Sequence, residues 1–215
     1  MFSALSNEFN AVSKILYDNH LLLDSNPFII KNYDGKQSYD LTWAGKNSAN
    51  SILFDEEKSC LELLSVIRPE RQYTFLLYDK SIIQVEYRIV DDEIIKGRLL
   101  FLKLQNKVWG FEELREYVHT PDLLDEILNE ESGFPIMIRI DFDPLNHVEC
   151  SHPKAHFVFS NVKDCRIPMK SIATLSQFVN FVFLQFYNKR INLPDKTTFA
   201  STITDAESQL FHINW

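Results

Sequence analysis

Apolar and polar residues alternate along several segments of the chain, as they do in strands with one buried face. Every second residue of the run 82–90 is apolar, and the flanking runs 73–78 and 93–104 are also rich in large apolar residues. These three runs predict an antiparallel meander whose first turn holds Asp79 and Lys80. The middle strand would then carry three polar side chains opposite its apolar ones, namely Gln84, Glu86 and Arg88.

The runs 136–142 and 155–159 show the same alternation and predict two further strands. In the first of them, Arg139 and Asp141 lie opposite the isoleucines. In the second, His156 lies opposite the phenylalanines. Both strands would therefore have one apolar face and one face with charged or titratable groups.

Apolar residues at three- and four-residue spacings predict helices, because such spacings place them on one helical stripe. Four segments have these spacings, at 2–18, 55–66, 111–118 and 120–128. A fifth helix is expected at 174–187, where Thr174 and Gln177 stand at the spacing of a capping box. This last segment is apolar on nearly every side, so we expect it to be deeply buried.

These elements together predict an α+β fold with a mainly antiparallel sheet, built as a meander, helices packed on one face and a buried C-terminal helix. No internal repeat, low-complexity segment or long linker divides the sequence. We therefore expect a single domain that spans 1–215, a length at which one hydrophobic core is sufficient.

Glycine is scarce, with only five copies in the chain. A P-loop and a dinucleotide-binding turn both need clustered glycines, so nucleotide enzymes of those two classes are excluded. Gly97 alone falls inside a predicted strand, where it indicates a bulge or the close approach of another segment. Any phosphate must be held by side chains such as Arg88 and Arg139.

The formal net charge of −8 argues against a broad nucleic-acid surface but allows a local basic site. Three cysteines without a C-x-x-C pair fit reduced thiols better than a disulfide framework. The N-terminal residues do not have a basic segment ahead of an apolar one, and no apolar stretch is long enough to span a bilayer. We therefore expect a cytoplasmic protein without a membrane partner.

Three of the six histidines fall between positions 147 and 156. If the alternating strands at 83–89, 136–142 and 155–159 are neighbours, one face of the sheet would collect a polar cluster. Its members would be Glu86, Arg88, Arg139, Asp141 and His156. A face that only packs against a helix would not need so many charges, so this cluster is the candidate site, with Glu86 and Arg88 as binding residues.

Three interpretations of this region stay open. In the first, His152 and His156 act as general acid and base on a phosphodiester, and Arg139 or Arg88 stabilises the charge that develops on phosphorus, as in a metal-independent ribonuclease. In the second, nitrogen and sulfur donors hold a metal such as zinc. The donors would be His147, Cys150, His152, His156 and Cys165. In the third, the histidines and charges have a structural role only.

A series of short motifs runs through the candidate site and the elements around it. The motifs are Tyr73-Thr-Phe-Leu-Leu-x-Asp79-x-Ser81, Arg139-x-Asp141, His152-Pro-x-x-His156, Cys165-Arg-Ile-Pro168, Phe178-x-x-Phe181 and Phe186-Tyr187. This series resembles a bacterial domain family of unknown function, whose members are small standalone proteins. The resemblance covers roughly residues 55–190 and implies no activity.

An R-x-D segment after a meander, followed by a histidine-rich strand, is also similar to small toxins of the TumE-like type. The matching positions are Arg139, Asp141, His152 and His156. Such toxins act in toxin–antitoxin or defence loci, so the similarity implies an RNA-cleaving site at these four residues. The chain differs from them in its longer ends and lacks their doubled histidine after the R-x-D segment.

From the residues and the resemblance together, we expect a component of a bacterial toxin or antiviral defence module with an RNA-cleaving catalytic site at Arg139, Asp141, His152 and His156. The alternative is a non-catalytic partner subunit that binds and regulates an effector protein through its acidic surface. The expected partners are a protein encoded nearby and RNA, and neither a cofactor nor a metal is expected. Whether the protein is an enzyme stays open.

Overall fold

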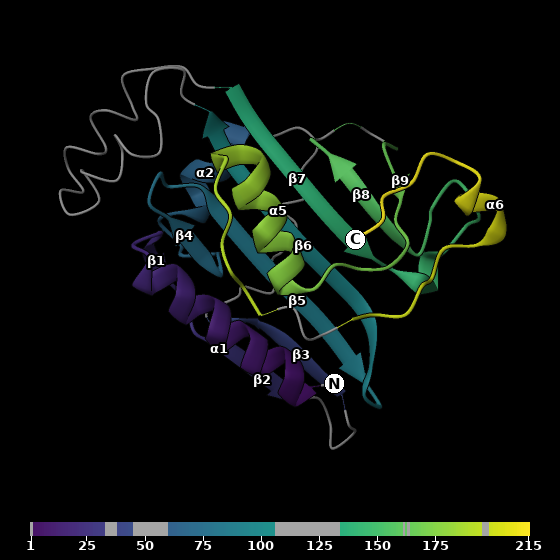
Figure 1. Cartoon of the computed structure of the whole chain (residues 1–215), viewed down its shortest axis with the longest axis horizontal. Coiled ribbons are helices and arrows are strands. Elements are labelled where there is room, and N and C mark those ends of the chain that lie inside the picture. The colour runs from purple at the N-terminus through teal and green to yellow at the C-terminus, as the bar shows by residue number, and fades with distance from the viewer. Residues whose placement is uncertain are drawn as a thin grey trace.

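The computed structural model describes residues 2–32, 38–44, 60–105, 134–160, 162, 164–194 and 198–215 (Figure 1). An antiparallel sheet of nine strands and four α-helices form this part of the chain, which confirms the predicted α+β class. The helices expected at 111–118 and 120–128 lie outside the described residues, as do the first residues of the helix expected at 55–66.

The nine strands form one sheet in which every neighbouring pair is antiparallel. They are β1 (Leu22–Ser25), β2 (Phe28–Asn32), β3 (Ser38–Trp43), β4 (Phe75–Leu77), β5 (Ile82–Val90), β6 (Glu93–Gln105), β7 (Phe134–Phe142), β8 (Ala155–Phe159) and β9 (Ile167–Pro168). Their order is β1-β4-β5-β6-β7-β8-β9, and β3, which also pairs with β2, joins the far half of β5. The predicted meander is thus confirmed as β4, β5 and β6.

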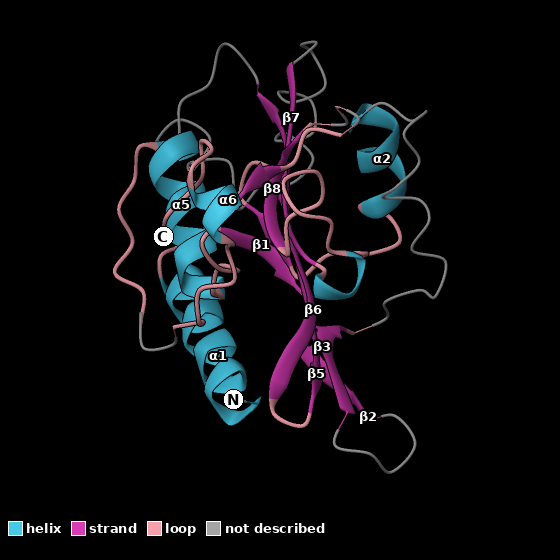
Figure 2. Cartoon of the chain, turned by 90° about the vertical axis from the view of Figure 1, so that its right-hand side faces the viewer, coloured by secondary structure: helices cyan, strands magenta, loops and turns pink. Residues whose placement is uncertain are grey.

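The helices cover the two faces of the sheet unequally. In the edge-on view of Figure 2, α1 (Phe2–Asp18) and α5 (Leu175–Tyr187) lie on one face and α2 (Cys60–Ile67) lies on the other. A 3-10 turn, η2 (Pro144–Asn146), follows β7, and the short α6 (Asp205–Ser208) lies near the C-terminus. No helix in the described ranges is long and apolar enough to cross a membrane.

The main core lies between the sheet and the pair α1 and α5. The apolar residues of β5 point into it, as their alternation predicts, and all four are buried: Ile83, Val85, Tyr87 and Ile89. The helix α5 contributes Phe178, Val179, Val182 and Phe183, none of which has measurable exposure. Burial of each such side chain is worth about 1.5–3 kcal/mol, so this face holds the fold together.

The predicted capping box at the start of α5 is confirmed. The hydroxyl of Thr174 accepts a hydrogen bond from the backbone N–H of Gln177, and the side chain of Gln177 accepts one from the backbone N–H of Thr174. One turn further, the N–H of Ser176 donates to a carboxylate oxygen of Glu8 at 2.8 Å. Two otherwise unsatisfied donors and an inter-helix bond therefore fix where α5 begins and how it meets α1.

Gly97 of β6 confirms the predicted close approach. A Cβ atom at this position would lie 2.2 Å from Cδ1 of Ile172 and 3.3 Å from Cδ1 of Tyr87. The register between β5 and β6 also shifts by one residue directly beside it, after Arg88. Only glycine lets the segment before α5 pack this closely on the sheet.

Two details differ from the sequence-based expectation. The helices do not all pack on one face, because α2 carries a second apolar stripe, Leu63, Leu64 and Ile67, that matches an apolar end of the opposite face. That end of the sheet is formed by Ile82, Leu100, Leu102 and Met137. In addition, β6 lies between β5 and β7, so β5 is not a direct neighbour of the two strands that carry the R-x-D and histidine motifs.

Candidate functional site

A row of polar side chains crosses four adjacent strands on the face that α2 covers only at one end. The strand registers pair Glu86 with Arg98, Arg98 with Asp141, and Asp141 with His156. Paired residues of an antiparallel sheet point to the same face, so the four side chains lie side by side. The inserted strand β6 thus joins the predicted residues instead of separating them, because it supplies Arg98 to the middle of the row.

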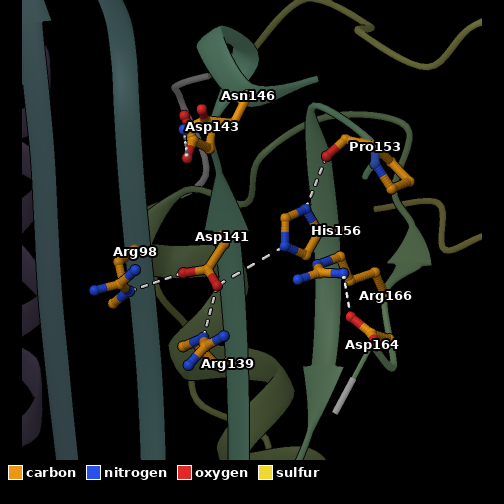
Figure 3. A network of polar contacts seen from close by, with 9 residues as sticks. All are labelled: Arg98, Arg139, Asp141, Asp143, Asn146, Pro153, His156, Asp164 and Arg166. Carbon is orange, nitrogen blue, oxygen red and sulfur yellow. Dashed lines mark hydrogen bonds and ion pairs between the residues drawn. The ribbon is translucent and has the colours of Figure 1, made fainter. Parts of the chain in front are cut away.

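Asp141 is the centre of the row (Figure 3). Its Oδ1 accepts a hydrogen bond from Nε of Arg98 at 2.8 Å, and its Oδ2 accepts one from Nε of Arg139 at 2.6 Å. Burial by itself would raise the pKa of Asp141, but the two guanidinium groups outweigh it and hold the pKa below its ordinary value. The carboxylate is therefore charged at neutral pH and orients both arginines.

His156 lies next to Asp141 and is almost fully buried, with 2% of its surface exposed. Its Nδ1 lies 2.8 Å from the backbone carbonyl oxygen of Pro153. A carbonyl can only accept, so Nδ1 carries the proton and donates it to this bond. Burial is the main cause of a lowered pKa at His156, which makes the ring neutral at pH 7. Its Nε2 lies 3.9 Å from Oδ2 of Asp141.

His152 lies beside His156, with the two ring centroids 4.8 Å apart in an edge-to-face arrangement. Its backbone is fixed by the short antiparallel bridge to Val148, whose carbonyl oxygen accepts the N–H of His152 at 2.7 Å. In contrast, the buried Nδ1 of His152 has no hydrogen-bond partner within the described part of the chain. Such orphaned polar atoms are rare in folded proteins and indicate a place where another group binds.

Four of the six predicted site residues therefore come together, namely Arg139, Asp141, His152 and His156. Glu86 stands at the β5 end of the same row, on the far side of Arg98. Arg88 does not join them, because its guanidinium makes two hydrogen bonds, of 2.7 and 2.9 Å, to the carboxylate of Asp40 on β3. Its position belongs to the half of β5 that pairs with β3, which is turned away from β8.

The metal interpretation finds no matching geometry. No group of three or more histidine, cysteine, aspartate or glutamate side chains in the described ranges is arranged to hold a metal ion, and those ranges include all five proposed donors. Nε2 of His147 lies 3.1 Å from Glu207 instead, and Cys150 is exposed at the surface. The five donors are thus distributed over separate contacts.

Three residues of this region were not anticipated from the sequence. Arg98 could have been found, since it stands at an alternate position of the predicted third strand of the meander, opposite the apolar face. Arg166 lies beside His156 in Figure 3 and bonds with Asp164 at 3.0 Å. Glu207 is fully buried in α6, far along the chain from the histidine it contacts, and no local pattern marks it.

The comparisons with known proteins give one match. The family model described as "Uncharacterized conserved protein (DUF2290)" matches residues 21–215. No curated protein and no solved structure matches the chain. The predicted resemblance to a family of unknown function is confirmed, and the match extends beyond the range 55–190 at both ends.

Proposed function

The chain belongs to the DUF2290 family of uncharacterized conserved proteins, and from that premise we propose that it is an RNA-binding component of a bacterial toxin or antiviral defence module. The observation that carries the proposal is the pair of arginines that one carboxylate orients. Asp141 holds Arg98 and Arg139 by their Nε atoms on adjacent strands, while about a fifth of each arginine side chain, 19% and 21%, stays exposed.

The local charge favours an anionic ligand. Two guanidinium groups, one carboxylate and a neutral imidazole leave one positive charge in excess at this site, in a chain whose formal net charge is −8. Planar guanidinium groups suit the oxygen geometry of phosphate. A local basic site on an acidic protein would bind a few phosphates of a flexible strand rather than a long stretch of duplex.

The histidines add a prediction of cleavage to the prediction of binding. His152 is partly exposed and has an orphaned Nδ1, so it would be the group that exchanges a proton with the substrate. His156 is buried, and its bond to Pro153 fixes its tautomer. We assign it the role of a positioning residue that packs against His152 and maintains the orientation of that ring.

The test is RNA binding by the full chain, measured by fluorescence anisotropy with a labelled single-stranded oligonucleotide. We expect Arg139→Gln to weaken binding about tenfold and to reduce its salt dependence, because one phosphate contact is lost. The matched control is Arg71→Gln, which removes an arginine whose side chain bonds to Asp24 and Asn26 near the far edge of the sheet. Equal affinities of wild type and Arg139→Gln would refute the proposal.

Cleavage is tested on the same oligonucleotide by gel analysis of the products. We expect His152→Ala to abolish cleavage and to leave RNA affinity within about twofold, since binding rests on the arginines. Binding without cleavage by the wild type would leave the RNA-binding proposal standing and remove the ribonuclease.

A second function, the non-catalytic partner subunit, is favoured by a different observation. Large apolar side chains stand exposed around α6 and the loop after β7, the most exposed being Leu145 at 83% and Phe211 at 79%. Exposed apolar groups gathered in one region mark interaction surfaces. This function and RNA binding use different surfaces, so each can be tested without the other.

A further inference from the structure

The exposed apolar residues near the C-terminus belong to two segments that a buried carboxylate holds together. Oε1 of Glu207 lies 3.1 Å from Nε2 of His147 and accepts the N–H of Cys150 at 3.4 Å. Glu207 also closes a capping box with Thr204. Burial by itself would raise the pKa of Glu207, but these donors hold it below its ordinary value, so the carboxylate stays charged and the two segments stay joined at neutral pH.

Four exposed apolar side chains flank this contact, and we name them the C-terminal apolar patch: Leu145, Val148, Leu210 and Phe211. The first two lie within two residues of His147, and the last two lie within four residues of Glu207. The contact between His147 and Glu207 therefore brings both pairs to one region of the surface. In Figure 1 this region is the end of the sheet beside α6.

The charges around the patch have one sign. The segments 143–152 and 204–212 hold four acidic residues, Asp143, Glu149, Asp205 and Glu207, and no lysine or arginine. Glu149 and Asp205 are exposed at its rim. A partner that covers the patch would need apolar groups for its centre and positive charges for its edge.

A second copy of the chain does not fit this requirement. A two-fold interface through the patch would bring Glu149 and Asp205 of one copy close to the same residues of the other, and such like charges oppose association. We therefore infer that the C-terminal apolar patch is the docking surface for a different protein, which presents an apolar anchor flanked by lysine or arginine.

The position of the patch links this partner to the candidate site. The loop that carries Leu145 and Val148 also carries His152, and the backbone bridge between Val148 and His152 fixes the path of that loop. A partner bound to the patch would hold Val148 and, through it, the ring of His152. The inference rests on the partner-subunit function and adds the place of docking, the chemistry of the partner and a route to the histidines.

The experiment uses the full chain and a labelled synthetic helix of leucine and lysine as the probe, with a leucine and glutamate helix of the same pattern as its counterpart. We expect the lysine helix to bind and the glutamate helix not to bind. The double variant Leu145→Ser/Phe211→Ser should weaken binding about tenfold or more, because two buried apolar contacts are lost. The charge variant Glu149→Lys/Asp205→Lys should weaken it to a similar extent.

The matched control is Tyr17→Ser, which removes an exposed aromatic side chain from α1 and should leave binding unchanged. Equal binding of both helices, or equal loss in the Tyr17 variant, would overturn the inference. Self-association of the wild type that disappears in the Phe211 variant would overturn it too, in favour of a homodimer. RNA affinity is measured in parallel, and we expect it to be unchanged in the patch variants, so that failure of RNA binding and failure of docking are distinguishable.

Discussion

The protein contains two buried carboxylates with cationic partners, and they lie on opposite sides of the sheet. Asp79 accepts hydrogen bonds from Lys103 of β6, from the hydroxyl of Tyr187 at 2.9 Å and from the N–H of Ser81 at 3.0 Å. Asp141 is held by Arg98 and Arg139 (Figure 3). Both carboxylates have a lowered pKa, because cations outweigh the effect of burial.

The two regions differ in whether water reaches their cations. Lys103 is buried to the same extent as the core around it, with 9% of its side chain exposed, and it lies 4.3 Å from the centre of the Tyr187 ring. The arginines around Asp141 are about twice as exposed. The same pattern of charge therefore ties elements together on one side of the sheet and offers groups to a ligand on the other. Exposure distinguishes the two, and the residue types do not.

The largest expected effect comes from Asp79→Asn. It leaves the charge of Lys103 buried without a carboxylate, which costs about 3–5 kcal/mol of the free energy of unfolding, measured by urea denaturation. The double variant Asp79→Asn/Lys103→Met should recover much of this loss, because no unpaired charge remains. A loss below about 1 kcal/mol would contradict the structural role of this pair.

A smaller loss is expected from Asp141→Asn, since its arginines reach water. We expect a cost of about 1.5–3 kcal/mol, the range of hydrogen bonds to charged groups. RNA affinity should fall as well, because the guanidinium groups lose their common acceptor, whereas Asp79→Asn should leave it unchanged at a temperature where that variant is folded. If both variants changed RNA affinity equally, the distinction between the two regions would be wrong.

The buried histidine predicts a pH dependence. The pKa of His156 lies below its ordinary value of 6.5 in the folded chain. Below pH 6.5 the unfolded chain takes up a proton that the folded chain does not, so stability is lost as the pH falls, by at most about 1.4 kcal/mol per pH unit. His156→Asn should flatten this slope between pH 7.5 and about 5.5 in urea titrations. His20→Asn, at an exposed histidine with a left-handed backbone that asparagine tolerates, is the control and should retain the slope.

The smallest expected effect is that of Tyr187→Phe, which removes one neutral donor from Asp79. We expect a loss of about 1 kcal/mol in the free energy of unfolding and no change in RNA affinity. A loss as large as that of Asp79→Asn would mean that Tyr187, and not Lys103, is the main partner of the carboxylate.

The shared family motifs divide between these two regions. Asp79, Ser81 and Tyr187 belong to motifs that were first noted only as a resemblance, and in the fold they form one hydrogen-bonded cluster. Arg139 and Asp141 belong to another motif and form the candidate site. A motif in sequence can thus mark a structural contact or a site, and only the fold shows which.

Local patterns were sufficient for most of the elements. The helix at Phe2–Asp18, the capped helix at Leu175–Tyr187 and the alternating strands appear where the spacing of apolar residues places them. Such elements are predictable because their signals lie within one turn or one strand. The order of the strands is not predictable in this way, because each pairing depends on residues far apart in the chain.

By itself, the sequence determined the secondary structure around the site, the apolar and polar faces of its strands, and the absence of a glycine-rich phosphate loop. The tertiary structure decided that β6 lies between β5 and β7, that Arg98 completes the row, that Arg88 pairs with Asp40 and that His156 is buried. The physical reason is that spacing records which face a side chain takes, whereas its partners and its access to water depend on which strands become neighbours.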